Sequence, residues 1–492
     1  MKNKRLIDDS KIKLNNTYLN LPEIFYSRQK PSEVPSSEIV ILNNDLAEDL
    51  GLDLAFLESK TGAEFLSGNK ILKDTHPIAQ AYGGHQFGYF TMLGDGRAVL
   101  LGEYTDKLGR IYDLTLKGSG QTVYSRGGDG KAALGPMLRE YIISEAMKGL
   151  NIPTTRALSV VSTGEWIYRE RGRQQGAVLA RIANSHLRVG TFQFAAKWCT
   201  LDDLKALADY ALNRHYRDIP ENVNPYEYLL KETIKKQASL IAKWQLVGFI
   251  HGVMNTDNMA ISGESIDYGP CAFMDTYDPD TVFSSIDREG RYAYKNQPEM
   301  AAWNLARFAE TLLPLLSDNH EEAVKIAQEA INEFGAEYHY YWYAGMRKKL
   351  GLFTAEEDDE ALISELLKLM EKYKSDYTNT FLYLTLNDLS KIDIFEEEEF
   401  KIWHKKWRER LARQDQDFND SIKLMKENNP TVIPRNLLVE DALNNAEENN
   451  DLSKFMQLLE AVKNPFNYED IKWQYTEPPK HTGCAFKTYC GT

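Results

Sequence analysis

The chain has 492 residues, 43% of them hydrophobic, and a formal net charge of −14. This length supports a large core in several domains or one elaborated domain, and the acidic balance disfavours nonspecific nucleic-acid binding. Four cysteines are too few for a disulfide scaffold and indicate a reducing compartment. Neither a membrane-spanning run nor a signal-peptide core is evident. We therefore expect a cytoplasmic monomer without membrane or nucleic-acid partners.

The first part of the chain predicts a sheet. Residues 1–70 mix short apolar pieces with turn formers, which predicts an N-terminal extension. Residues 71–195 are rich in glycine, and strands are expected at 98–101, 112–116 and 177–180. One helix interrupts them, with Pro136 at its first position and Gly149 as its C-cap.

The rest of the chain predicts helices, in a lobe at 196–320 and a C-terminal extension at 321–492. A long helix is expected at 227–250, leading straight into the loop at His251, and further helices at 298–316, 320–349, 356–373 and 397–413. Acidic runs at 356–360 and 396–399 are interpreted as solvated helix starts. This order indicates an α+β fold with a nucleotide cleft between two lobes.

Two glycine-rich segments are candidates for holding phosphates. Gly94, Gly96 and Arg97 precede an expected strand, and a hairpin turn explains the same glycines. The loop 118–131, which contains Asp129 and Gly130, offers many backbone N–H groups for an anion. A mobile surface loop is the alternative.

Lys117 ends an alternating strand, as does the lysine that contacts nucleotide phosphates in protein kinases. Glu140, on the expected helix, is the candidate partner for this lysine. Glu145 is the alternative, and a strand-end lysine at the surface is the simpler interpretation. Arg181 and Arg188 lie seven residues apart, on one helical face or flanking a tight turn. Both could bind a phosphate through paired N–H groups, or form surface ion pairs.

The segment from His251 to Asn258, followed by Asp267-Tyr268-Gly269, has the spacing of a kinase catalytic loop and metal-binding triplet. Val253 stands where a kinase has its catalytic aspartate, and an apolar side chain cannot accept a proton. Asp257 is the only carboxylate in this loop and is the candidate base, although an Asx turn also explains it. Asn258 and Asp267 offer oxygen ligands suited to Mg²⁺.

These motifs together resemble the selenoprotein O (SelO, or YdiU) family, which is similar in fold to protein kinases. The resemblance rests on five blocks of sequence at 81–88, 93–97, 117–120, 124–130 and 251–270. It implies a kinase-like two-lobe fold and transfer of AMP from ATP to Ser, Thr or Tyr hydroxyls of other proteins, with ATP flipped relative to kinases. Transfer of UMP from UTP and the use of Mn²⁺ are also associated with the family.

The resemblance also assigns roles. Asp257 would accept a proton, Asn258 and Asp267 would hold Mg²⁺ or Mn²⁺, and Glu140 would pair with Lys117. The residues expected to contact ATP are Gly94, Gly96, Arg97, Lys117, Asp129, Gly130, Arg181, Arg188 and Asp267. A kinase with a relocated base and an inactive nucleotide-binding scaffold are the alternative functions.

The family is linked to redox control through a disulfide near the chain end. Here the resemblance implies Cys271 paired with Cys490, and Cys484 is the rival for Cys490. The protein substrates would then include redox-related proteins.

Overall fold

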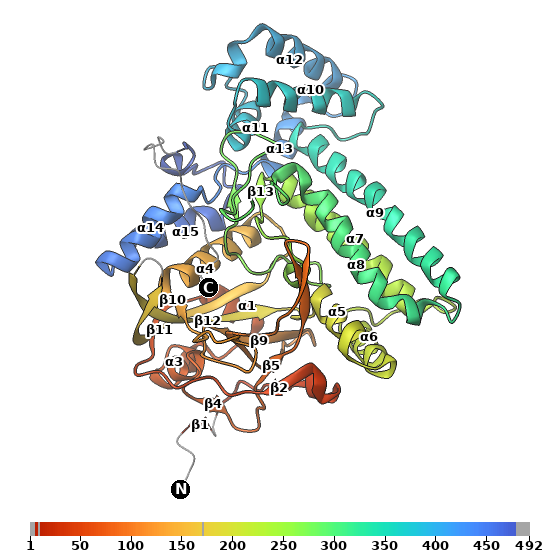
Figure 1. Ribbon diagram of the computed structural model, residues 1–492. Coiled ribbons are helices and arrows are strands. Elements are labelled where there is room, and N and C mark those ends of the chain that lie inside the picture. Colours follow the sequence, from red (N-terminus) through yellow and green to blue (C-terminus); the bar gives the residue numbers. More distant parts are fainter. Residues whose placement is uncertain (1–4, 8–9, 170–171, 479–492) are drawn as a thin grey trace.

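The computed structural model describes residues 5–7, 10–169 and 172–478. Strands dominate the first part of the chain and helices the rest, so that a sheet half and a helical half lie side by side (Figure 1). The expected α+β class is confirmed. Within the described ranges, no helix combines the length and apolar character needed to cross a bilayer.

An antiparallel sheet of eight strands forms the centre of the first half. Its strands are β2 (Tyr26–Arg28), β3 (Glu38–Leu42), β5 (Ile78–Gln80), β8 (Ala98–Thr105), β9 (Ile111–Lys117), β10 (Ala132–Ala133), β11 (Arg156–Arg169) and β12 (Gly172–Ala183). The order is β2-β5-β8-β9-β12-β11-β3, and β10 pairs with β12. The three expected strands are confirmed within β8, β9 and β12. Residues 1–70 provide both edge strands, β2 and β3.

Helices cover both faces of this sheet. One face is covered by α1 (Asn44–Leu50), α2 (Leu54–Leu57) and α3 (Lys60–Leu66), and the other by α4 (Leu134–Gly149). Successive side chains of a strand point to opposite faces. Leu114 and Leu116 of β9 pack in the apolar cluster with α1–α3, so Lys117 faces the side of α4. Two short pairs complete this half: β1 (Leu6–Ile7) with β4 (Ile71–Leu72), and β6 (Gly83–Gln86) with β7 (Tyr89–Met92).

Long helices build the second half. They are α5 (Val189–Trp198), α6 (Leu201–His215), α7 (Pro225–Leu246), α8 (Gln297–Leu316) and α9 (His320–Lys349). Between α7 and α8 the chain forms β13 (Phe249–Ile250), the 3-10 turn η3 (Thr256–Asn258) and β14 (Ala272–Phe273). This connection contains all the motif residues from His251 to Asp267.

The C-terminal helices form two groups (Figure 1). One has its own apolar core and contains α10 (Asp359–Lys372), α11 (Tyr377–Leu386), α12 (Glu398–Leu411) and α13 (Phe418–Asn428). The other, α14 (Asn436–Asn449) and α15 (Ser453–Lys463), returns to pack against α4. The expected boundaries at 70, 195 and 320 stay predictions.

Most expected helices are confirmed, but several details are wrong. Pro136 is the third residue of α4, and Gly149 is its last helical residue; Leu150 is the C-cap. A Cβ at Gly149 would lie 2.7 Å from the carbonyl oxygen of Val462, so this glycine permits close packing with α15. Helix α7 ends at Leu246, four residues early, because 249–250 pair with β14.

The acidic run at 356–360 is not wholly solvated. Asp359 is fully buried, and its Oδ1 accepts a hydrogen bond of 2.7 Å from Nε of Arg410. A buried carboxylate needs such a partner, and here the partner comes from α12. The expected solvated helix start is therefore wrong at this residue.

Candidate active site

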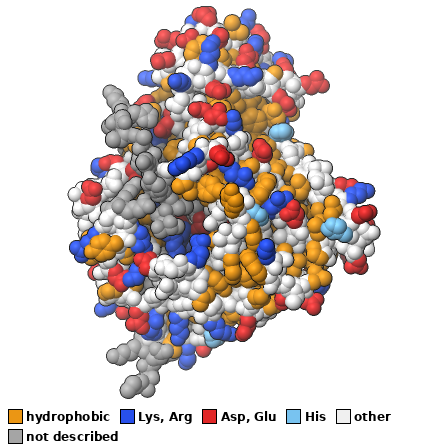
Figure 2. All heavy atoms as spheres, viewed as in Figure 1, with side chains coloured by type: hydrophobic (Ala, Val, Ile, Leu, Met, Phe, Trp, Pro, Cys, Tyr) orange, Lys and Arg blue, Asp and Glu red, His pale blue; other side chains and the backbone are white. Residues whose placement is uncertain are grey.

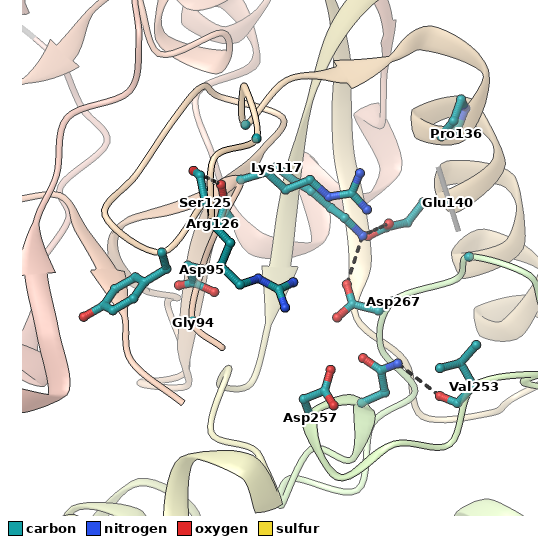
Figure 3. A pocket seen from close by; sticks show the side chains of 18 of the residues that line it. Gly94, Asp95, Lys117, Ser125, Arg126, Pro136, Glu140, Val253, Asp257 and Asp267 are labelled. Carbon is teal, nitrogen blue, oxygen red and sulfur yellow. Dashed lines mark hydrogen bonds and ion pairs between the residues drawn. The ribbon is translucent and has the colours of Figure 1, made fainter. Parts of the chain in front are cut away.

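A cavity of about 1010 Å³ opens between the sheet half and the helical half (Figure 3). Its size suits a small-molecule or cofactor ligand. Every residue expected from the sequence to bind nucleotide or metal, or to act as a base, lines it: Gly94, Gly96, Arg97, Lys117, Asp129, Gly130, Glu140, Arg181, Arg188, Asp257, Asn258 and Asp267. The structure thus brings together residues spread over 174 positions of the chain.

Lys117 lies at the centre of the cavity wall. Its Nζ donates to Oε2 of Glu140 at 2.5 Å and to Oδ1 of Asp267 at 2.9 Å. The lysine is only 8% exposed, which excludes the surface interpretation. Glu145 points elsewhere because five residues rotate a helix by about 140°. Its carboxylate instead binds Arg156 at 2.5 and 2.7 Å.

Arg181 and Arg188 converge on the same aspartate. Nη1 of Arg181 donates to Oδ1 of Asp267 at 2.7 Å and to Oε1 of Glu140 at 3.2 Å. Nη1 of Arg188 donates to Oδ2 of Asp267 at 2.8 Å. Arg181 lies on β12 and Arg188 caps α5, so they flank a turn and do not share a helical face. Both are buried, which also excludes surface ion pairs.

This cluster fixes the charge of Asp267. Burial would raise the pKa of its carboxyl, but Lys117, Arg181 and Arg188 hold that pKa well below its usual range. Three cations face two carboxylates, so the cluster carries excess positive charge. Nε of each arginine is buried and has no hydrogen-bond partner among the described residues. Buried donors of this kind are normally satisfied.

Asp257 lies on η3, near Asp267 in the cavity (Figure 3). Burial raises the pKa of its carboxyl to about 6, with Arg188 opposing the shift. Its Oδ1 is buried and lacks a hydrogen-bond partner within the described part of the chain. The backbone of Gly84 packs against it, since a Cβ there would lie 2.8 Å from Oδ1.

The neighbouring Asn258 is held in place by the loop itself. Its Nδ2 donates to the carbonyl of Val253 at 3.0 Å, which leaves its Oδ1 as an acceptor. Val253 is buried and lines the cavity, so the position that a kinase gives to its base carries no proton acceptor.

The two glycine-rich segments pack on each other. Gly94 has φ of +127°, and a Cβ there would lie 2.4 Å from Cγ of Tyr124. Gly130 has φ of +66°, and a Cβ there would lie 2.1 Å from the carbonyl oxygen of Gly120. The loop 118–131 is tied to the first segment because Thr122 Oγ1 donates to the carbonyl of Asp95 at 2.6 Å. Glycine is needed here for the conformation and the close approach.

Asp129 differs from the other candidates. Its carboxylate pairs with Arg169 at the rim, at 2.8 and 3.0 Å, and about half of its side chain is exposed. It lines the cavity without joining the buried cluster.

Known proteins are similar to this chain over nearly its whole length. A family model described as protein adenylyltransferase SelO matches residues 9–463. The protein nucleotidyltransferase YdiU of Clostridium botulinum (strain Eklund 17B / Type B) is 62% identical over 492 residues, 100% of both chains. Proteins of the same name from Clostridium beijerinckii and Lachnoclostridium phytofermentans are each 59% identical, over 480 and 481 residues; the alignments cover 98% of this chain and 98% and 99% of theirs.

This chain belongs to the SelO family. It is accordingly a nucleotidyltransferase. The family predicted from the motifs is confirmed, and the match covers every described residue of the cavity wall.

Sequence reasoning gave no role to several residues of this SelO-family site. Asp95, between the two glycines, is buried, and burial raises the pKa of its carboxyl to about 6. The ring of Tyr82 lies 4.7 Å from Cζ of Arg188. Both residues occur in the blocks that carry the resemblance, but neither has a spacing that indicates its contacts.

His251 is another residue whose task emerges only from the structure. It is buried, stacks on Trp244, and its Nε2 lies 3.0 Å from the carbonyl oxygen of Ile266. Its Nδ1 accepts a hydrogen bond of 3.4 Å from the N–H of Val253. Burial lowers the pKa of its imidazole, so a neutral ring with a proton on Nε2 fits both contacts. His251 ties the loop of Asp257 to the residue before Asp267.

Arg139, beside Glu140 on α4, fastens the segment that follows Asp267. It donates to the carbonyls of Gly269 at 3.2 Å and Cys271 at 2.6 Å. On its other side it binds Glu440 at 2.8 Å and Asn436 at 2.7 Å. Helix α14 is therefore linked through one side chain to the backbone next to the site.

Cys271 is buried and does not line the cavity. Cys484 and Cys490 lie outside the described residues, as does any pairing of Cys271 with them.

The cavity offers few protein ligands for a metal ion. Across residues 5–7, 10–169 and 172–478, no group of three or more His, Cys, Asp or Glu side chains is placed to hold one. Asp267 and Asn258 nevertheless offer a carboxylate and an amide oxygen to the same cavity. Mg²⁺ in phosphate-transfer sites typically has one or two carboxylates, with waters and substrate phosphates as its other ligands. The residues present fit that pattern.

Proposed function

We propose that this protein transfers AMP from ATP to Ser, Thr or Tyr hydroxyls of other proteins and releases pyrophosphate. The observation that carries the proposal is the cavity itself: three buried cations meet at Asp267, and a separate buried carboxylate, Asp257, lies near an apolar Val253. The family membership and the names of the relatives support nucleotidyl transfer to protein.

The triphosphate would occupy the cationic part of the cavity. Lys117, Arg181 and Arg188, which line it, would neutralise its oxygens. The backbone of the glycine-rich segments, with Gly94, Gly96, Arg97, Asp129 and Gly130, would contact the rest of the nucleotide. Such positioning and charge stabilisation supply most of the catalysis at phosphorus.

Asp257 would act as the general base. Its carboxylate would take the proton of the attacking hydroxyl, whose oxygen bonds to the α-phosphorus while the bond to the pyrophosphate oxygen breaks. Asn258 and Asp267 would hold Mg²⁺ or Mn²⁺, which when bound would neutralise charge on the phosphate oxygens. Arg188 would hold Asp257 and Asp267 in a fixed relative position.

The flipped orientation of ATP and the kinase-like two-lobe fold belong to this proposal. In a kinase the base faces the γ-phosphate. Here the kinase base position holds Val253, and the remaining carboxylate lies on η3. Transfer of UMP from UTP would use the same residues, because the proposed base and cations contact only phosphates and the acceptor.

The deciding experiment is intact-mass analysis of the protein and a protein acceptor after incubation with ATP and Mg²⁺, alongside ATP labelled at the α- or γ-phosphate. We expect addition of one AMP unit and transfer of the α-label. Transfer of the γ-label would instead show a kinase with a relocated base. Binding of ATP with neither label transferred would show an inactive scaffold.

A further inference from the structure

The hairpin β6–β7 stands at the mouth of the cavity. Its two-residue turn, Phe87-Gly88, has φ of +50° and +88°, as in the tight turns that suit hairpins. Gln86 and Phe87 line the cavity. The turn end of the hairpin is therefore part of the cavity wall.

The inner strand β6 is fastened to the loop of the proposed base. The N–H of His85 donates to Oγ1 of Thr256 at 2.6 Å, and the N–H of Phe87 donates to Oδ1 of Asn255 at 3.1 Å. With Gly84 packed against Asp257, these contacts fix the hairpin relative to that carboxylate.

The outer strand β7 presents backbone groups without a strand partner. Residues opposite each other in an antiparallel pair alternate between bonding each other and pointing outward. The N–H of His85 points outward, to Thr256. The backbone N–H and C=O groups of its partner Phe90 therefore also point outward, away from β6, and so do those of Met92, two residues further on. Among the described residues, no strand pairs with this outer edge. Its outward groups have the spacing that an added strand requires.

This edge also lacks the protection that exposed edges usually have. Natural proteins block them with charges, prolines or bulges. Strand β7 reads Tyr-Phe-Thr-Met, and its register with β6 is continuous. Tyr89 is 80% exposed and Met92 is 47% exposed. Hydrophobic side chains gather on this face of the molecule (Figure 2), and Ile286, also exposed, lines the cavity.

The charge beside β7 is opposite to that of the whole chain. A second cavity of about 330 Å³ is lined by Phe90, Lys197 and Arg307. Nζ of Lys197 lies 5.5 Å from the ring centre of Phe90. Arg307 and Arg291 both stack on Trp303, and Glu310, the one acidic residue lining this cavity, pairs with Arg307. In a protein of net charge −14, this local excess of cations favours an acidic partner.

We propose that β7 is the docking edge for the acceptor: an extended, acidic segment of the protein substrate adds to β7 as a further strand. Main-chain bonds to Phe90 and Met92 bind it regardless of its side chains, and its acidic residues face Lys197. Tyr89 and Thr91 share the face of Gly84 that packs against Asp257. Alternate side chains of the added strand therefore lie on the same side of the hairpin as that carboxylate. This inference rests on the proposed function.

The test compares Met92→Pro with Met92→Ala. Proline removes the outward N–H without removing a bond inside the hairpin, whereas alanine removes only the side chain. The probe is reduced, carboxymethylated α-lactalbumin, an unfolded acidic protein, with α-labelled ATP. We expect the KM for this acceptor to be at least tenfold higher in Met92→Pro than in Met92→Ala. Self-modification by each sample is measured alongside as the reference for its activity. Thermal unfolding of both variants verifies folding.

A charge test addresses the second half of the inference. We expect Lys197→Glu to raise the KM for the same acidic acceptor severalfold, and to lower it for a carboxymethylated acceptor whose lysines outnumber its acidic residues. An acceptor KM that is equal in Met92→Pro and Met92→Ala overturns docking on β7. A wild-type protein that modifies itself but never modifies the unfolded acceptor overturns it as well. Absence of both self-modification and acceptor labelling would count against the proposed function itself.

Discussion

Nη1 of Arg188 donates both to Oδ2 of Asp267, at 2.8 Å, and to the carbonyl of Asp257, at 2.7 Å. One guanidinium group thus joins the residue proposed to hold the metal to the backbone of the proposed base. The arginine is buried, and its ring neighbour Tyr82 packs against it. A side chain from the turn before α5 thus links the carboxylate of Asp267 to the backbone of Asp257.

The first prediction concerns Arg188→Lys. A lysine keeps the positive charge, but it replaces the planar guanidinium, whose Nη1 reaches both acceptors, with a compact ammonium on a flexible stem. We expect kcat/KM for AMP transfer to fall by about 100-fold, because both positioning and phosphate contacts are lost. Steady-state kinetics with α-labelled ATP measures this. Arg413→Lys, at an exposed ion pair, is the control, and equal losses in the two variants would refute the role of Arg188.

Asp257→Asn tests the proposed base directly. The amide has the same shape but cannot accept the proton of the hydroxyl, so we expect kcat to fall by about 10²–10⁴-fold. The KM for ATP should change little, since the cations that hold the triphosphate are untouched. Isothermal titration with a nonhydrolysable ATP analogue separates binding from turnover. Activity equal to that of wild type would remove Asp257 from the mechanism.

The pairing of Lys117 leads to a prediction with an internal control. Glu140→Gln removes the carboxylate that accepts from Lys117 and Arg181, and the freed lysine should bind more closely to Asp267. We expect the Kd for ATP to rise about tenfold, a loss of about 1.4 kcal/mol. Glu145→Gln, on another face of α4, should lower the Tm through Arg156 and leave the Kd unchanged. Similar Kd values for the two variants would contradict the assignment.

The contrast between Glu140 and Glu145 shows what the sequence could decide. Strand alternation places Lys117 on the cavity face, and helical rotation separates the two glutamates, so local periodicity narrows the choice. Asp257 could be singled out as the candidate base because no other carboxylate exists in its loop. These inferences need only local geometry and the motif spacing.

Other parts of the site depend on contacts between distant segments. Whether Arg181 and Arg188 share a helix or flank a turn is decided by β12 pairing with β9. Asp359 appeared solvated by its acidic neighbours, yet Arg410, 51 residues away, buries it. Residues 1–70 gave no sign that they supply both edges of the sheet, because edge pairing depends on partners elsewhere in the chain. Such features follow from tertiary packing rather than local pattern.

Arg139→Lys should reveal how far the C-terminal helices support catalysis. Arg139 holds Gly269 and Cys271 on one side and α14 on the other, and a lysine cannot make these contacts together. We expect kcat to fall about tenfold with a smaller change in KM for ATP, since misplacement of the segment after Asp267 affects the reacting geometry most. Glu440→Gln should lower the Tm by about as much as Arg139→Lys does, but its kcat should stay close to that of wild type. A variant with lowered Tm and unchanged kcat would show that Arg139 has only a structural role.

The last prediction concerns Lys349, which is 2% exposed and lies 4.1 Å from the ring centre of Phe381. Burial lowers the pKa of its amine to about 7, far below the value near 10.4 of a free lysine. Between these values the unfolded chain binds the proton more strongly than the folded protein, so the free energy of unfolding rises with pH across that window and falls as pH decreases. We expect Lys349→Met to be more stable than wild type by several kcal/mol near pH 7, at about 1.4 kcal/mol per pKa unit, with the difference closing by about pH 10.4. Urea unfolding at pH 7, 8, 9 and 10 measures the trend, and Lys348→Met, at an exposed neighbour, is the control. A stability difference that does not depend on pH would show that Lys349 is charged in the folded protein throughout this range.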